Sequence, residues 1–280
     1  MNRKFLVVML FMITSILYSF EEGFIWGLRA NFNGSLTLPS ISQEDLNKLS
    51  AAYMKGAVGY TMDGEAELGY LFGAERWFGK EKSDFSKFSG ISLYVSIGVG
   101  TGFSGMVSGN TIGGATVNVF MNVNYKPVIS FGIGSKLYLF ESRMAIGLQL
   151  GIKTIVDTSP EYLAYSDMDF SGMGVKLPEI GEIVVTDFMK KNMNPVMFSL
   201  KLMLEYNQPI NDRVEVVLGI YTRFNIYKPK YITMPDSLLG LINAAKKTQN
   251  AAEFNPQTPL NSYYINSLDF GVTLGLQFRG

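Results

Sequence analysis

The sequence contains no cysteine and no histidine. Without cysteine the chain can form neither a disulfide nor a thiolate metal site, and it cannot carry a lipid on an N-terminal cysteine. Without histidine it lacks the usual general base near neutral pH and the commonest metal ligand. We therefore expect no cofactor, no metal site and no enzymatic activity.

Charge is scarce and balanced. Charged residues make up 17% of the chain, with 24 Lys and Arg against 24 Asp and Glu. No basic field is present to attract nucleic acid, so we expect no nucleic-acid partner. Glycine (29), phenylalanine (20) and tyrosine (15) are abundant instead. That composition favours strands and turns.

A long apolar run occurs at the N-terminus. Arg3 and Lys4 precede a mainly apolar stretch from Phe5 to Leu17, which is the pattern of a secretory signal peptide. A membrane anchor is the alternative, but the run is shorter than the roughly 20 residues that a spanning helix needs. We predict a signal peptide over residues 1–19, cleaved at Ser19, and a single domain over residues 20–280.

The rest of the sequence alternates between apolar and polar residues. No later segment has the apolar length of a membrane helix, so the chain could span a bilayer only as a closed barrel. The last segment, 264–278, alternates most clearly, with apolar residues at every second position from Leu268 to Phe278. Similar faces recur in the segments 26–32, 66–72, 91–99, 129–139, 144–152, 196–206 and 214–226. Together they predict eight strands.

Alternation alone does not separate a membrane barrel from a soluble periplasmic barrel or sandwich, whose apolar face points inward. Three features favour the membrane. The faces stay apolar for most of the roughly 9 to 11 residues that a tilted strand needs to cross. Short connections near 141–143 and 208–213 alternate with long ones over 157–194 and 227–262. Aromatic residues gather at strand ends, with Trp26, Phe72, Tyr206 and Phe278 at one rim and Phe32, Tyr60, Phe198, Phe224 and Tyr264 near the other.

The segment 116–140 leaves the strand count open, because Lys126 and Pro127 could mark a turn and give ten strands. Parity favours one crossing. Val117 has the same odd numbering as Phe131, so we expect the apolar face to continue through Pro127 without a slip. We predict an all-β, antiparallel up-and-down transmembrane β-barrel of eight strands, with short helices in its external loops.

This pattern resembles that of the small outer-membrane β-barrels, of which the outer-membrane protein W and A/X groups are eight-stranded members. The resemblance covers roughly residues 23–278 and lies in pattern and topology. The final strand, 268–278, is similar to the signal that the outer-membrane assembly machinery reads, although the chain continues with Arg279 and Gly280. The resemblance implies the bacterial outer membrane, with its lipid and assembly machinery as partners, and binding or passage of small apolar or amphipathic molecules.

The polar face of these strands carries charges and glycines. Opposite charges could pair and fill the lumen, or they could line an aqueous path; we favour filling, because eight strands enclose little more than their own side chains. Inward glycines such as Gly98, Gly132 and Gly134 would then relieve crowding. The predicted lumen-lining residues are Arg29, Glu65, Glu67, Lys136, Lys153, Lys201, Glu205, Glu215, Arg223 and Asp269.

The external loops contain apolar residues at helical spacing. Ser42 with Asp45 indicates a helix start, Asp236 can cap a second helix, and residues 179–191 suggest a third. Their apolar faces could pack on one another or form a site for a small hydrophobic ligand. The candidate apolar loop site consists of Leu46, Leu49, Tyr53, Leu238, Leu239, Leu241 and Ile242. The alternative function is a plugged barrel that displays its loops to an extracellular partner.

Overall fold

A computed structural model describes residues 22–48, 51–73, 88–112, 115–140, 142–156, 158–166, 179–182, 196–228, 243 and 263–280. The predicted signal peptide, Leu49 and the loop residues 238–242 lie outside these ranges. Within them, no helix is long and apolar enough to cross a membrane.

Eight antiparallel strands close into a ring, which confirms the predicted barrel and its strand count. Each strand pairs with its two neighbours, and the ladder between β4 and β5 completes the circle. In the order of the ring, the strands are β1 (Gly23–Ile41), β3 (Val58–Gly73), β4 (Phe88–Ile112), β5 (Ala115–Leu139), β6 (Met144–Ile155), β9 (Val196–Asn211), β10 (Val214–Tyr227) and β11 (Tyr263–Arg279).

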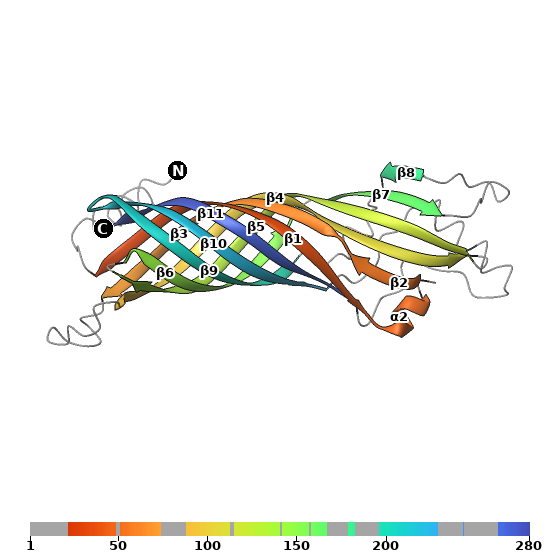
Figure 1. Cartoon of the computed structure of the whole chain (residues 1–280), viewed down its shortest axis with the longest axis horizontal. Coiled ribbons are helices and arrows are strands. Elements are labelled where there is room, and N and C mark those ends of the chain that lie inside the picture. Colours follow the sequence, from red (N-terminus) through yellow and green to blue (C-terminus); the bar gives the residue numbers. More distant parts are fainter. Residues whose placement is uncertain are drawn as a thin grey trace, which may run out of the picture.

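The strands are strongly tilted (Figure 1). The stagger of the strands can be followed from each residue to the residue paired with it on the next strand. One circuit of the barrel passes through Leu28, Ala66, Ile97, Phe131, Ile152, Phe198, Ile226, Asn266 and Leu38. The circuit begins on β1 at Leu28 and returns to β1 at Leu38, ten residues farther along. An eight-stranded barrel with such a stagger has an interior just wide enough for side chains.

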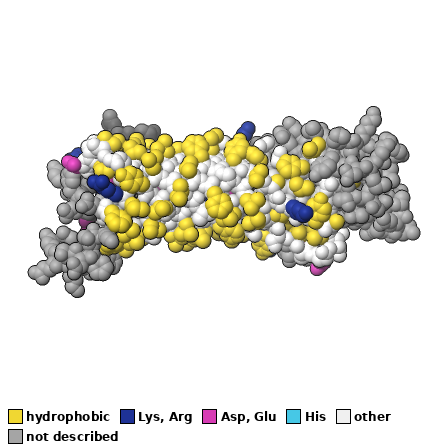
Figure 2. All heavy atoms as spheres, in the orientation of Figure 1, with side chains coloured by type: hydrophobic (Ala, Val, Ile, Leu, Met, Phe, Trp, Pro, Cys, Tyr) yellow, Lys and Arg dark blue, Asp and Glu magenta, His cyan; other side chains and the backbone are white. Residues whose placement is uncertain are grey.

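The outer wall is apolar. Large hydrophobic side chains such as Leu28, Ile97 and Leu148 point outward and are exposed, and they form a band along the barrel (Figure 2). At one rim Trp26 stacks on Phe278 with 3.9 Å between ring centroids. A closed barrel with an apolar outer band and aromatic rims spans a membrane. Because short turns of such barrels face the periplasm, we call the end with the turns at 142–143 and 212–213 the periplasmic end.

The strand β5 makes a single crossing, as predicted, but its face does slip. Gly100 pairs with Val128 and Gly102 with Tyr125, so Lys126 and Pro127 together stand opposite Thr101. This extra residue is a β-bulge, and it exchanges the two faces of the strand. Val117, Val119 and Met121 are consequently buried, whereas Phe131 and Ile133 are exposed. The prediction of a continuous face through Pro127 was wrong, because parity in sequence cannot register a bulge.

One side of the barrel continues beyond the membrane-spanning band as an external sheet (Figure 1). In it β2 (Ala51–Gly56) pairs with the outer half of β4, and β7 (Thr158–Ser166) pairs with the outer half of β5. The short strand β8 (Glu179–Glu182) pairs in turn with β7. We call this extension, made by β2, β4, β5, β7 and β8, the outer sheet.

The predicted loop helices are only partly observed. Helix α2 (Gln43–Lys48) begins after Ser42, whose hydroxyl accepts a hydrogen bond from the backbone N–H of Asp45 at 3.1 Å. The helix start is confirmed, and Tyr53, farther along the chain, lies in β2 and not in this helix. The prediction of a helix over residues 179–191 was wrong at its start, where residues 179–182 form β8. There the backbone pairs with β7, and such tertiary pairing overrides a weak local helical pattern.

Candidate functional site

The inward face of the barrel carries a dense set of charged side chains. All ten residues predicted to line the lumen point inward and are buried. Alternation places them there, because the opposite face of each strand meets lipid. Within the described lumen the cations and anions match in number. They are Arg29, Lys136, Lys153, Lys201, Arg223 and Arg279 against Asp63, Glu65, Glu67, Glu205, Glu215 and Asp269.

The centre of the lumen holds a four-residue ion cluster, which we call the central cluster. It consists of Arg29 on β1, Glu67 on β3, Lys136 on β5 and Glu205 on β9. Arg29 lies 2.9 Å from Glu67 and 3.2 Å from Glu205. Lys136 lies 2.7 Å from Glu67 and 3.1 Å from Glu205. Each cation thus joins the same two carboxylates, and the cluster ties four strands together across the lumen.

A second layer lies toward the outer end. The Lys201 ammonium contacts Glu65 at 3.0 Å, and the Gln149 side-chain amide donates a 2.6 Å hydrogen bond to the same carboxylate. Asn31 donates a third hydrogen bond to Glu65 at 3.1 Å. Glu65 is therefore held by one cation and two neutral donors, which is the arrangement that lets a buried charge persist.

A third layer pairs Arg223 with Asp63 at 3.1 Å. Arg223 and Lys201 both lie over the ring of Tyr221, at 5.2 Å and 4.8 Å from its centroid. The Tyr221 hydroxyl in turn accepts a 2.9 Å hydrogen bond from Asn33. Aromatic faces attract cations, so Tyr221 fills space between the layers without adding charge.

The periplasmic end of the lumen is closed by a small apolar layer. Ile25, Leu71, Tyr138 and Ala145 form a buried cluster there. Beside it, Arg279 pairs with Glu215 at 2.9 Å. From this end up to the third layer, the described interior therefore contains buried apolar and ion-paired side chains.

Inward glycines make room for this packing. A Cβ atom built on Gly134 would lie 2.5 Å from Cζ of Tyr94, and one on Gly132 would lie 2.7 Å from the Ser96 hydroxyl oxygen. The Tyr94 ring packs with Met203 and carries the Lys136 ammonium at 4.8 Å from its centroid. The prediction that these glycines relieve crowding is confirmed.

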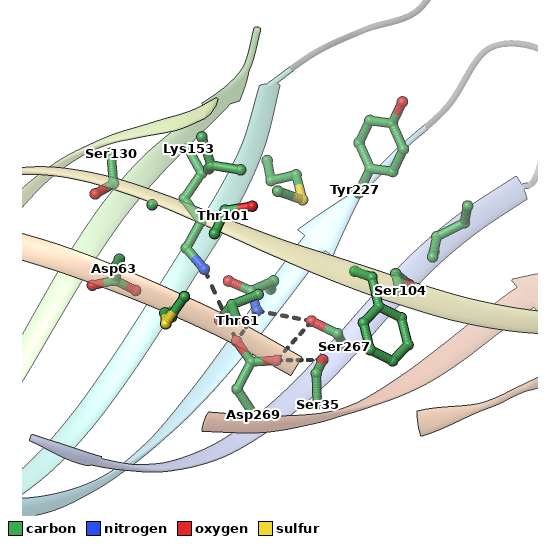
Figure 3. A pocket seen from close by; sticks show the side chains of 17 residues that line it. Ser35, Thr61, Asp63, Thr101, Ser104, Ser130, Lys153, Tyr227, Ser267 and Asp269 are labelled. Carbon is green, nitrogen blue, oxygen red and sulfur yellow. Dashed lines mark hydrogen bonds and ion pairs between the residues drawn. The ribbon is translucent and has the colours of Figure 1, made fainter. Parts of the chain in front are cut away.

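A cavity of about 50 Å³ lies above the third layer, at the outer end of the barrel. Its floor includes Lys153 and Asp269, whose ammonium nitrogen and carboxylate oxygen are 3.9 Å apart (Figure 3). Thr61, Ser104 and Ser130 contribute hydroxyls to the lining. Met197, Tyr227 and Ile265, from the outer ends of β9, β10 and β11, contribute apolar surface. We call this space the mouth cavity.

Of the predicted apolar loop site, the structure describes only Leu46 and Tyr53. Leu46 lies in α2, whereas the ring of Tyr53 lies in β2, where its hydroxyl donates a hydrogen bond to Asn118 and the Lys55 ammonium sits over it at 4.8 Å. Tyr53 therefore belongs to the outer sheet. Leu49, Leu238, Leu239, Leu241 and Ile242 lie outside the described residues.

Sequence reasoning missed several residues of the lumen. Asp63 has the same parity as Glu65 and Glu67, and the alternation could have been followed two residues farther to find it. Asn31 and Gln149 share faces with predicted residues but are neutral, so a search for charges passes over them. The described residues contain no group of three or more Asp, Glu, His or Cys that could hold a metal ion.

Comparison with known proteins gives likeness of structure only. Neither a scan against protein-family models nor a search of curated proteins found a match. Among solved structures, the chain is similar to Neisserial surface protein A, at 6% identity over 91% of this chain and 97% of that one, with a TM-score of 0.31. It is similar to the outer membrane protein OprG from Pseudomonas aeruginosa, at 8% identity over 93% and 98% of the two chains, with a TM-score of 0.30. It is also similar to the outer membrane protease OmpT from Escherichia coli, at 8% identity over 94% and 99%, with a TM-score of 0.33.

The fold assignment rests on the chain's own features. Eight strands pair into a closed ring, the outer wall is apolar, and buried ion pairs occupy the interior. In a soluble barrel the apolar face would have been inside. The chain is a transmembrane β-barrel of the outer-membrane type.

Proposed function

We propose that the barrel binds small amphipathic molecules at its outer end and does not pass them through its lumen. The observation that carries this proposal is the position of the mouth cavity directly above an ion-paired interior. The cavity combines hydroxyls, a charged pair and apolar side chains in its lining. Binding sites for small molecules generally combine a mainly apolar lining with a few polar groups.

The interior argues against passage. A solute crossing the lumen would have to separate the central cluster and the layers above it. Removing one partner from a buried ion pair costs about 3–5 kcal/mol, and several pairs lie in series here. We therefore expect a filled lumen under the mouth cavity and no steady aqueous path.

The size of the mouth cavity limits what enters it. About 50 Å³ holds one small chemical group, whereas sites that enclose a whole drug-sized ligand measure about 300–1,000 Å³. The head of an amphipathic molecule would enter, and its tail would lie against apolar residues such as Ile265 and Met197 at the rim. Thr101, which stands opposite the β5 bulge, also lines the cavity. The interrupted ladder at the bulge is thus a candidate route of entry from the bilayer.

Direct binding tests the proposal. Folded protein in lipid nanodiscs would be titrated with small apolar and amphipathic molecules, with empty nanodiscs as the blank. We expect saturable binding that a bulky substitution in the cavity, Ser130→Trp, abolishes, while Gln208→Trp, at an exposed residue near the periplasmic end of β9, leaves it unchanged. Absence of saturable binding with every ligand would end the proposal.

The outer sheet favours a second candidate function, the display of an extracellular surface to a partner. β4 and β5 continue well past the bulge, and three further strands pair onto them. A filled barrel would then serve as an anchor. Replacing residues 103–124 by a short turn should abolish adhesion of cells that carry the protein and leave the barrel folded. Unchanged adhesion would remove this candidate.

Recognition of the last strand by the outer-membrane assembly machinery remains part of the proposal. Phe270, Val272 and Leu274 of β11 are exposed on the lipid side, and Phe278 follows them on the same face. Deleting Phe278 should lower the amount of barrel in the outer membrane without changing its refolding in detergent. A matched loss of refolding would assign the residue to stability instead.

A further inference from the structure

Lys153 differs from the other cations of the described lumen in its surroundings. Arg29, Lys136, Lys201, Arg223 and Arg279 each have a carboxylate oxygen between 2.7 and 3.1 Å away. The nearest carboxylate oxygen to the Lys153 ammonium belongs to Asp269, and at 3.9 Å it is beyond hydrogen-bond distance. The side chain of Lys153 is nevertheless only 9% exposed. An ammonium with three donors is therefore buried without a close acceptor among the described residues.

Asp269 does not depend on Lys153 for its hydrogen bonds. Its carboxylate accepts hydrogen bonds from the Ser35 hydroxyl at 2.7 Å, the Asn225 amide at 2.7 Å and the Ser267 hydroxyl at 3.1 Å. Three neutral donors thus hold the carboxylate in place at the wall (Figure 3). Lys153 can therefore bind a second anion while Asp269 keeps its three hydrogen-bond donors.

The space beside Lys153 suits a small anionic group. Lys153 borders the mouth cavity, and the hydroxyls of Thr61 and Ser130 line the same space. Hydrogen bonds from a charged donor to a carboxylate are roughly twice as strong as those between neutral groups. An uncharged head would also accept a hydrogen bond from the ammonium, but it would lack the attraction between opposite charges that a carboxylate adds. The cavity should therefore bind a ligand with a negatively charged head more tightly than one with a neutral head.

We propose that Lys153 binds the carboxylate head of a small amphipathic molecule in the mouth cavity, with the aliphatic tail at the apolar rim. The proposal rests on the ligand-binding function proposed above and adds the charge of the ligand to it. Lys153 donates to the carboxylate oxygens, and the lining hydroxyls donate from the sides. Neutral molecules of the same length should bind more weakly, because they cannot form an ion pair with the Lys153 ammonium.

The test compares hexanoate with hexanol, which share a tail length and differ in the charge of the head. Both would be titrated calorimetrically into the folded full-length barrel in nanodiscs, with empty nanodiscs as the blank. We expect hexanoate to bind at least about tenfold more tightly than hexanol, the equivalent of about 1.4 kcal/mol. Lys153→Met should remove this preference, and Lys153→Arg should keep most of it. Lys55→Met, at an exposed lysine of β2 that does not line the cavity, is the control and should change nothing.

Each outcome decides between the two proposals. Equal affinities for hexanoate and hexanol in the unmodified protein would overturn the role of Lys153 and leave the ligand-binding function standing. A preference for hexanoate that survives in a folded Lys153→Met barrel would do the same. Failure of both molecules to saturate would overturn the role of Lys153, and failure of every other ligand titrated as well would overturn the ligand-binding function. Heat-modifiable migration on a denaturing gel establishes that each variant is folded, and the comparison in the unmodified protein needs no variant.

Discussion

Arg29 and Glu205 lie on strands that are not neighbours, yet the Arg29 Nε atom is 3.2 Å from Oε1 of Glu205. In the sheet β11 and β10 separate their strands. The contact therefore crosses the lumen, and Lys136 reaches the same carboxylate at 3.1 Å from a third strand. Such contacts fill the barrel and resist its flattening, because each one fixes the distance between strands that share no backbone hydrogen bonds.

Arg29→Met should destabilise the barrel by about 3–5 kcal/mol, because it leaves two buried carboxylates with Lys136 as their only cation in the cluster. The measurement is urea unfolding in phospholipid vesicles, followed by tryptophan fluorescence. Arg143→Met is the matched control, since Arg143 is exposed at a periplasmic turn and its removal should cost less than about 0.5 kcal/mol. A loss below about 1 kcal/mol for Arg29→Met would show that the cluster contributes little to stability.

The folded barrel should give no discrete conductance steps in a planar bilayer. The four-residue variant with serine at Arg29, Glu67, Lys136 and Glu205 should also be silent, because the apolar layer around Tyr138 and the Glu65–Lys201 layer still close the lumen on either side. A porin added to the same membrane establishes that channels are detectable. Reproducible steps from heat-modifiable unmodified protein would mean that the ion pairs line a path, and would return passage to consideration.

Gly134→Ala should cost about 1–3 kcal/mol, because the new methyl group would collide with the Tyr94 ring. Gly34→Ala makes the same chemical change on β1, where nothing lies within 4 Å of the added atom. There we expect no loss, or a gain of up to about 1 kcal/mol from reduced chain entropy. Equal effects at the two sites, measured by urea unfolding, would contradict crowding as the reason for Gly134.

Ile97→Arg should cost about 2–4 kcal/mol, because Ile97 lies within the apolar outer face of β4. Val58→Arg, at the outer end of β3 where the chain leaves the apolar band, should cost about 0–1 kcal/mol. Both side chains are exposed on the outside of the barrel. If water surrounded the barrel, the two arginine substitutions would therefore cost equally little stability. Refolding into vesicles therefore tests the lipid contact directly, and equal costs at the two positions would argue against the band.

Ligand binding at the mouth cavity adds a stability prediction. At one hundred times its dissociation constant, a ligand that binds only the folded barrel stabilises it by about 2.7 kcal/mol. Hexanoate should therefore raise the unfolding midpoint of the unmodified barrel more than that of Lys153→Met. An equal rise in both would indicate a general effect of the added solute.

The sequence by itself determined which residues of a regular strand share a face, and its connections and aromatic strand ends favoured the apolar face as the one that meets lipid. Alternation has a period of two, and the strands from Leu28 to Phe278 keep it, so the apolar positions point outward wherever the ladder is regular. The same alternation placed Arg29, Glu65 and Lys201 inside. The short connections and the count of eight alternating segments then predicted a closed eight-stranded barrel, in which every strand has a neighbour on each side.

Tertiary structure alone decided three things. Pairing of Arg29 with Glu205 and of Lys136 with Glu67 depends on the stagger of the ring, because alternation gives the face of a residue and not its height along the barrel axis. The bulge at Lys126 and Pro127 placed Val117 on the inward face. One extra unpaired residue exchanges the inward and outward positions of a strand, and the hydrophobic pattern of the sequence does not reveal it. The distance between Lys153 on β6 and Asp269 on β11 depends on closure of the ring, because β9 and β10 separate these two strands.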